Sequence, residues 1–258
     1  MNTKTLTHRA FSVIAQYEHF TLEQAVCSVP YFNNKVTRSR ASLRTLVGKG
    51  SPKDIHEELL GILIKNHVDQ KEIGDESLKR ILTDNNIGID CSGFAYYILN
   101  AESEERNKGP LDKHLHFVNC HGLFGKIRCA LRPVENCDVR TLADNKNSRA
   151  IPIQDAQPGD IISMLSGPDE SDRDHILVIY QIEYQNFVPT KIHYTHAVAY
   201  PSDGIYGTGI KKGIIQIADI SKDLVSQLWT ENEKTGQDNI LFVRATKSTT
   251  ELRRLLFL

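Results

Sequence analysis

Hydrophobic and polar positions change their spacing near residue 150, and this change divides the predicted elements into two groups. Before it, apolar residues recur at helical intervals, and the first 88 residues suggest mainly helices. After it, β-branched residues alternate with polar ones between turns. This later part predicts strands at residues 160–165, 175–184, 191–200, 213–219 and 239–246, and one late helix at 221–232 with Ser221 as its cap. Helices early and strands late predict an α+β fold with a largely antiparallel sheet.

Helix-start signals support some of the early helices. Ser51 followed by Pro52 supplies an N-cap and a first-turn proline for a helix over "SPKDIHEELLGILIKN". Thr21 and Gln24 resemble a capping box before a short helix. Another short helix fits residues 75–83.

Cys91 lies where a glycine-containing loop is followed by a helix, in "NNIGIDCSGFAYYILN". Phe94, Tyr97 and Ile98 have helical spacing, so Cys91 is predicted to lie in the first turn. There the unpaired backbone N–H groups and the positive end of the helix dipole lower a cysteine pKa and can hold an oxyanion. A buried, inert cysteine is the alternative, so the question is whether the chain also supplies a base.

Two of the ten histidines are predicted to meet across a hairpin. The segments "DHILVIYQIEYQ" and "NFVPTKIHYTHAV" have turn chemistry around Gln185 and Asn186. If the strands pair symmetrically about that turn, paired residue numbers sum to about 371. His175 and His196 meet this condition and would face each other, whereas His193 would point to the opposite face of the sheet.

The three residues have complementary chemical roles. Cys91 would be the nucleophile, and His175 would take its proton and later protonate the leaving amine. His196 would orient and polarise His175. The alternatives are a strand-end His175 bonded to the nearby acids of "DRD" and a His196 that is an ordinary core histidine.

These motifs resemble those of the NlpC-like, papain-fold cysteine peptidases that cut bacterial peptidoglycan. The segment "GIDCSGF" is similar to that family's nucleophile motif, and "QPGDIISM" to its first sheet strand. The segment "DHILVIY" is similar to its base-bearing strand and "THAVAY" to the strand of its third polar residue. The resemblance implies a papain-like cysteine peptidase fold, with the nucleophile at a helix N-terminus packed on the sheet. It also implies Cys91, His175 and His196 as the catalytic set.

The resemblance further implies substrate contacts. Asp90 and Ser92 match positions that line a subsite for a free peptide amine. The tyrosine of "VPYFNN", Tyr31, matches a residue that helps to complete the oxyanion site, and an ordinary buried tyrosine is the alternative. Leu177 stands where the family usually has glycine, so a bulkier packing partner is expected there.

The resemblance also sets the predicted domains. Residues 1–84 would be a helical N-terminal extension and 85–258 the catalytic domain, with an inserted subdomain at about 101–150. Histidines and cysteines in this insert lack C-x-x-C or H-x-x-x-H spacing, so no metal site is predicted. No cofactor is expected.

Composition limits the partners and the compartment. The 258 residues carry a formal net charge of −1, so no global field favours nucleic acid or an acidic membrane. The five cysteines are sparse and odd in number, which favours incidental thiols in a reducing compartment. No export signal or membrane span is recognised, so a cytoplasmic location is expected.

The expected activity is hydrolysis of an amide bond in a peptidoglycan stem peptide or muropeptide through a Cys91 acyl-enzyme. A transferase with the same triad would pass the acyl group to an amine or a lipid instead of water. A binding module on the same fold would not need a reactive thiol.

Overall fold

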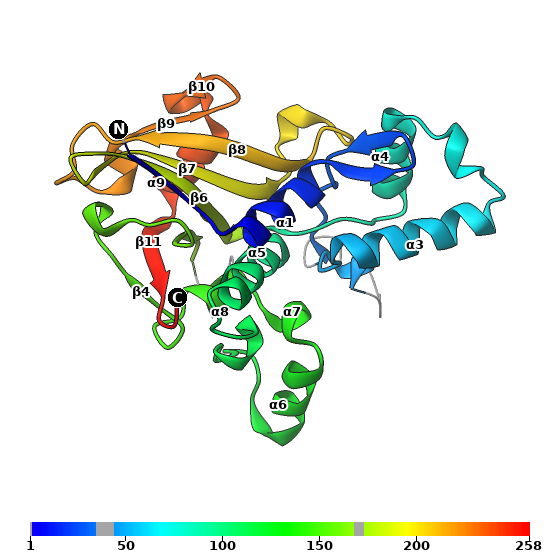
Figure 1. Ribbon diagram of the computed structural model, residues 1–258, viewed down its shortest axis with the longest axis horizontal. Coiled ribbons are helices and arrows are strands. Elements are labelled where there is room, and N and C mark those ends of the chain that lie inside the picture. Colours follow the sequence, from blue (N-terminus) through cyan, green and yellow to red (C-terminus); the bar gives the residue numbers. More distant parts are fainter. Residues whose placement is uncertain (1, 35–43, 168–172) are drawn as a thin grey trace.

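The computed structural model describes residues 2–34, 44–167 and 173–258, and an antiparallel sheet lies at its centre (Figure 1). Within these ranges the sheet has nine strands in the order β10–β9–β8–β7–β6–β5–β11–β4, and β1 pairs with the far half of β6. The sheet strands are β1 Asn2–Thr5, β4 Ser148–Ala150, β5 Ile161–Leu165, β6 His175–Gln185, β7 Val188–Val198, β8 Gly209–Gln216, β9 Leu228–Glu231, β10 Lys234–Thr235 and β11 Thr249–Leu255.

Helices pack on both faces of this sheet, so the α+β class predicted from the sequence is confirmed. Helices α1 and α5 lie against one face and α9 against the other (Figure 1). The described helices are α1 His8–Glu18, α3 Pro52–Lys65, α4 Asp75–Asp84, α5 Cys91–Glu105, α6 Gly122–Leu131, α7 Pro133–Asn136, α8 Val139–Ala143 and α9 Ile240–Lys247.

Alternate residues of β6 belong to two different hydrophobic cores. Ile176 and Val178 pack in the core that contains α5, whereas Leu177 and Ile179 pack in the core that contains Leu241 of α9. Successive strand residues point to opposite faces, so a strand covered on both sides is apolar throughout. Leu177 is fully buried among these residues, which explains the large side chain at this position.

The N-terminal region belongs to the core beneath α5. Tyr17 of α1 packs edge-on against Phe94 of α5 with ring centroids 5.3 Å apart, and Leu59 of α3 joins the same core. Strand β1 hydrogen-bonds to β6 through pairs such as Asn2 with Tyr184. The predicted boundary at residue 84 is therefore not a boundary between separate cores.

The early helix signals had mixed outcomes. Ser51 caps α3 as predicted, because its hydroxyl accepts the Asp54 N–H at 3.1 Å and the Asp54 carboxylate accepts the Ser51 N–H at 2.9 Å. The helix expected at 75–83 is α4. The helix expected after Thr21 is wrong, because β2 (Phe20–Leu22) and β3 (Ala25–Cys27) form a small hairpin there.

The two late elements are exchanged relative to the prediction. The segment expected as a strand at 239–246 forms α9 (Ile240–Lys247) instead, because the Asn239 side chain accepts the N–H groups of Leu241 and Phe242 and caps a helix. Residues 221–232 do not form a helix that Ser221 caps. They form a 3₁₀ turn and then β9, which pairs with β8.

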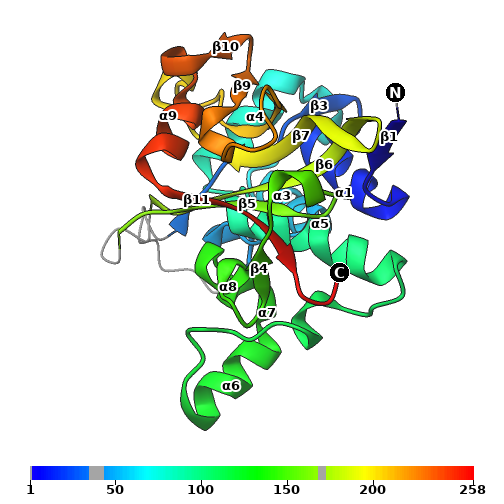
Figure 2. The same cartoon turned by 90° about the vertical axis from the view of Figure 1, so that its left-hand side faces the viewer.

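The insert projects from the rest of the molecule. Helices α6 and α7 extend away from the sheet in two perpendicular views (Figure 1 and Figure 2). Cys120 and Cys129 form a disulfide at the base of α6, so they are not the free thiols that the sequence predicted.

Neither a cluster of metal-ligating side chains nor a membrane-spanning helix occurs among residues 2–34, 44–167 and 173–258. No group of three or more histidine, cysteine or acidic residues could hold a metal ion. None of the helices in these ranges is long and apolar enough to cross a membrane.

The β6–β7 hairpin turns at Asn186 and Phe187, one residue later than the predicted centre. Both residues have left-handed backbone conformations, with φ of 50° and 67°, and Gln185 pairs with Val188 across the turn. Such two-residue turns suit the twist of antiparallel strands and favour glycine at the second position. Phe187 is 93% exposed, so its ring contributes little packing there.

We expect Phe187→Gly to raise the free energy of unfolding by about 1 kcal/mol, because glycine adopts a positive φ without the steric cost of a Cβ atom. Urea unfolding would measure the change. Phe187→Ala is the matched control, since it removes the same ring but keeps the Cβ atom. Equal stability of the two variants would contradict the role of backbone strain.

Candidate active site

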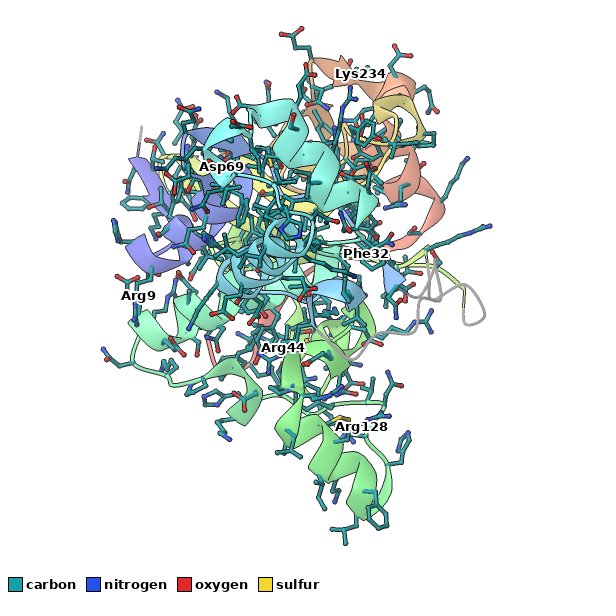
Figure 3. The ribbon with its side chains drawn as sticks, turned by 90° about the vertical axis from the view of Figure 1, so that its right-hand side faces the viewer. Arg9, Phe32, Arg44, Asp69, Arg128 and Lys234 are labelled. Atoms are coloured by element: carbon teal, nitrogen blue, oxygen red, sulfur yellow. A yellow bond between two sulfur atoms is a disulfide. The ribbon has the colours of Figure 1, made fainter. Side chains whose placement is uncertain are left out.

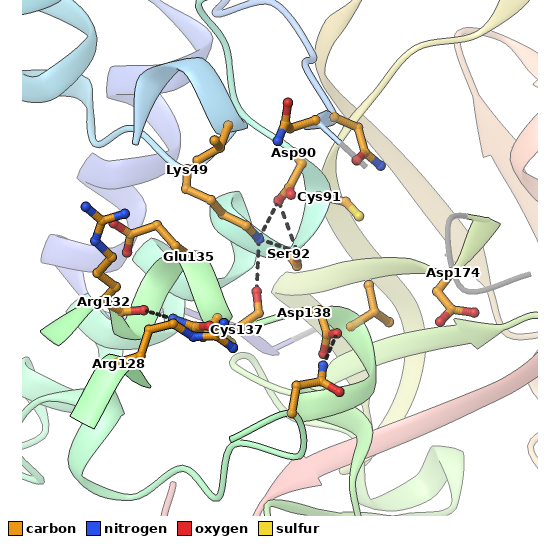
Figure 4. A pocket seen from close by; sticks show the side chains of 16 residues that line it. Lys49, Asp90, Cys91, Ser92, Arg128, Arg132, Glu135, Cys137, Asp138 and Asp174 are labelled. Atoms are coloured by element: carbon orange, nitrogen blue, oxygen red, sulfur yellow. Dashed lines mark hydrogen bonds and ion pairs between the residues drawn. The ribbon is translucent and has the colours of Figure 1, made fainter. Parts of the chain in front are cut away.

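Cys91 is the first residue of α5 and lies beside a cavity of about 340 Å³ (Figure 4). Asp90 is the N-cap, and its Oδ1 accepts the Gly93 N–H at 2.6 Å. The backbone N–H groups of Cys91 and Ser92 have no hydrogen-bond acceptor among the described residues. The predicted position of the cysteine is confirmed, and two donors next to its sulfur are available to an oxyanion.

His175 and His196 are in contact, but they are diagonal neighbours. Strand β6 pairs with β7 through Val178 and Thr195, and the next step of this register sets His196 opposite Leu177. The predicted direct facing is therefore wrong, because the turn is centred one residue later. The rings still meet, since strand residues two apart share a face. His175 Nε2 and His196 Nδ1 are 2.7 Å apart.

A buried glutamate, Glu231, extends the pair His175–His196 into a hydrogen-bonded row of three side chains. Glu231 Oε2 lies 2.8 Å from His196 Nε2, and Glu231 Oε1 accepts the Tyr200 hydroxyl at 2.6 Å. Burial alone would raise the pKa of Glu231, but the positive charge that His196 carries when protonated and the hydrogen bonds from His196 and Tyr200 outweigh it and lower the pKa. Glu231 is thus ionised and accepts a hydrogen bond from His196.

The Glu231 carboxylate determines which ring nitrogen of each histidine carries a proton. His196 must donate from Nε2 to Glu231, so its Nδ1 in the neutral ring is an acceptor. His175 must then donate from Nε2 to His196, which leaves His175 Nδ1 with a free lone pair. No described residue hydrogen-bonds to that nitrogen. The arrangement therefore presents His175 as a neutral base.

Cys91 lies against the strand that carries this base. The backbone N–H of Ile176, the residue after His175, donates toward the Cys91 sulfur. Within the described ranges, no hydrogen bond joins the sulfur to His175 itself. The Asp174 carboxylate, one of the acids proposed as an alternative partner of His175, instead pairs with Arg140 at 2.6 Å.

Burial keeps both reacting groups neutral. It raises the pKa of Cys91 to about 12, and the Asp90 charge adds to this effect against the opposing charges of Lys49 and Arg244. Burial, with Arg244 and His196, lowers the pKa of His175 well below its usual value. The thiolate favoured by the helix N-terminus in the sequence argument is therefore not the resting form.

Lys49 occupies the position that the sequence assigned to a substrate amine. Its Nζ donates to Asp90 Oδ1 at 2.9 Å, to Ser92 Oγ at 2.6 Å and to the Cys137 carbonyl at 2.9 Å (Figure 4). These bonds use all three donors of the ammonium. Asp90 and Ser92 therefore hold this chain's own lysine, and a substrate amine would have to displace it.

Tyr31 lies close to the nucleophile despite the long sequence interval. It forms an isolated parallel bridge with Ile89, two residues before Cys91. Its pKa is raised by burial first, and then by the charges of Cys91 and Asp90. The Tyr31 hydroxyl accepts from the Asn33 amide at 3.2 Å, so its own proton remains to be donated. Its proposed role at the oxyanion stays a prediction.

Lys49, Glu231 and Arg244 were not found by sequence reasoning. Lys49 belongs to none of the motifs described above, and Glu231 lies in a segment expected to be helical. Both contacts depend on pairing between distant segments, which no short motif records. Of these three residues only Glu231 could have been anticipated, because a buried histidine such as His196 needs a hydrogen-bond partner.

Comparison of the chain with protein-family models, curated proteins and solved structures found no match in any of the three.

We expect alkylation of Cys91 by iodoacetamide to rise about tenfold per pH unit between pH 7 and 9 without a plateau, because the thiol pKa is raised and only the thiolate reacts. Mass spectrometry of the Cys91 peptide would separate it from Cys27 and Cys137, which are also free thiols. Cys91→Ser is the control. A plateau below pH 8 would show a preformed thiolate and contradict the neutral resting state.

We expect Lys49→Met to lower the free energy of unfolding by about 3–5 kcal/mol, because it leaves the buried Asp90 charge without its partner. Lys53→Met is the matched control, since the Lys53–Glu57 pair is exposed and contributes little. Guanidinium unfolding followed by circular dichroism would compare them. Similar losses in both variants would show that the buried pair has no special role.

Proposed function

We propose that this chain is a cysteine hydrolase that cleaves an amide bond through a Cys91 acyl-enzyme. The observation that carries the proposal is the row from Glu231 through His196 to His175, together with the backbone hydrogen bond from Ile176, the residue after His175, toward Cys91 at a helix N-terminus. A cysteine at a helix start packed on an antiparallel sheet is also what a papain-like fold would provide. An inert core cysteine would not need an oriented base.

The first half of the reaction starts from a neutral Cys91 thiol and a neutral His175 imidazole. Cys91 Sγ attacks the carbonyl carbon while His175 Nδ1 takes the thiol proton, so charge separates only as the new bond forms. The carbonyl oxygen becomes an oxyanion near the N–H groups of Cys91 and Ser92, with Tyr31 as a further donor. Glu231, through His196, stabilises the imidazolium. His175 then gives its proton to the leaving amine as the C–N bond breaks, which leaves a thioester.

The second half returns the enzyme to its resting state. Water enters in place of the amine and gives a proton to His175 as it attacks the thioester carbon. The carbon–sulfur bond breaks, and the proton returns from His175 to the Cys91 sulfur. The carboxylic acid leaves. An amine or alcohol in place of water would give the transferase reaction instead.

The pocket is compatible with an anionic peptide. Arg128 and Arg132 line the cavity beside Cys91, and both side chains are exposed. Carboxylates of a peptidoglycan stem peptide are suitable partners for guanidinium groups. The resemblance of the motifs points to the bond between D-glutamate and a diamino acid. Lys49 fills the predicted amine subsite, so we propose that the substrate does not place a free amine there.

The test is cleavage of purified muropeptides, with products identified by mass spectrometry. We expect His175→Ala to lower kcat/KM by about 10²–10⁴-fold, because it removes the general base. Cys91→Ala should abolish turnover. Glu231→Gln should lower kcat by about tenfold or more, since it removes the charge that stabilises the imidazolium.

His193→Ala is the matched control. His193 is on β7, the strand that carries His196, but it bonds to Glu183 at 2.9 Å and points away from the site. It should retain activity. Cleavage that persists in Cys91→Ala would contradict the mechanism, and the absence of cleavage by the wild type would contradict the substrate. Addition of a competing amine distinguishes hydrolysis from transfer by the products.

A further inference from the structure

Helix α6 exposes a cluster of large apolar side chains. Most exposed apolar residues elsewhere are single, whereas here they follow one another along a ten-residue helix. A contiguous exposed apolar patch of this kind marks an interaction site. The exposed fractions are 72% for Leu123, 87% for Phe124, 47% for Ile127 and 72% for Leu131.

The helix has a defined inner and outer face. Cys129 is buried, and a Cβ atom at Gly125 would lie 3.1 Å from the Cys120 backbone. These two positions, four residues apart, face the segment to which the Cys120–Cys129 disulfide joins the helix. The side chains of the apolar cluster therefore point outward because α6 is held from its other side.

Cations border the apolar face on both sides. At about 100° per residue, the apolar side chains and Ala130 cover an arc of about 120°, and Lys126 and Arg128 each lie about 40° beyond one edge. Residues 113–134 contain four lysines and arginines and no acidic residue. Among the described residues, no ion pair involves Lys126 or Arg128. Figure 3 shows Arg128 on the projecting helix.

We propose that α6 is a docking surface for an anionic phospholipid bilayer. A helix with an apolar face bordered by cations lies in the interface between headgroups and acyl chains, where both sets of groups are satisfied. The projecting position of α6 (Figure 1 and Figure 2) leaves this face accessible to a flat, fluid surface. The near-neutral charge of the whole chain does not oppose docking, because lipid charge acts over a short distance.

Docking also places the cavity near the lipid. Arg128 borders the apolar face of α6 and lines the cavity that contains Cys91. The proposal does not depend on the chemistry of Cys91, and an inactive protein would still bind. It concerns where the cavity is held, and not what reacts in it.

Co-sedimentation of the full chain with vesicles tests the proposal. We expect binding to vesicles of phosphatidylcholine with phosphatidylglycerol, and much weaker binding to phosphatidylcholine alone or at high salt. Phe124→Ser should lower the partition coefficient about tenfold or more, since a buried aromatic side chain is lost. Lys126→Gln should lower it about fivefold. Ile64→Ser is the matched control, because Ile64 is 75% exposed on α3 and should leave binding unchanged.

A Phe124→Trp variant provides a second measurement. Trp229 is the only native tryptophan and is buried, so its emission is a constant background. The emission of the new tryptophan should shift to shorter wavelength on addition of the anionic vesicles. No binding by the wild type, or equal binding by Phe124→Ser and Ile64→Ser, would overturn the proposal. Self-association that Phe124→Ser abolishes, without vesicle binding, would assign the face to a second copy of the chain.

Discussion

The carboxylate of Asp90 and the ammonium of Lys49 form the contact on which the arrangement of the site depends. One oxygen of Asp90 accepts from the start of α5, from Ser92 and from Lys49. Lys49 reaches on to the carbonyl of Cys137, and the Asp90 N–H bonds back to Gly48. The helix start and two walls of the cavity are thereby fixed to one another. A buried ion pair loses hydration, so its geometric role explains its presence better than stability alone.

The second buried carboxylate, Glu231, acts at a distance from the sulfur. It lies on β9, three strands from the strand β6 that carries His175, and determines which nitrogen of each ring carries a proton. The two carboxylates therefore divide the work: Asp90 positions the nucleophile and Glu231 orients the base. Burial disfavours separated charge in the resting site, so a substrate carbonyl is needed to receive the negative charge as it develops.

Local chemistry could be predicted from the sequence, and long-range pairing could not. Ser51 acts as the predicted cap because capping depends on neighbours within a few residues. The two histidines were found even though the turn at Phe187 was misplaced. Moving the centre of the turn by one residue shifts the pairing of the strands by two residues, and residues two apart lie on the same face of a strand. Phe187 carries no turn signal. Residues 221–232 were wrongly predicted to be helical because Leu224, Leu228 and Trp229 have helical spacing. In the structure the Trp229 indole donates to the Leu224 carbonyl, and the segment that contains Trp229 pairs with β8 as a strand.

The order of strands has a consequence for how the molecule folds. Strand β11 lies between β4 and β5, and Arg253 bonds to Ser148 across a sequence separation of 105 residues. Strand β6 likewise takes β5 along one half and β1 along the other. Contacts of such high order form slowly, since large loops must close before any pairing is gained. During synthesis the edge of β5 that faces away from β6 stays unpaired until β11, residues 249–255, has been made, so β5 remains an open edge strand while β6 to β9 are added.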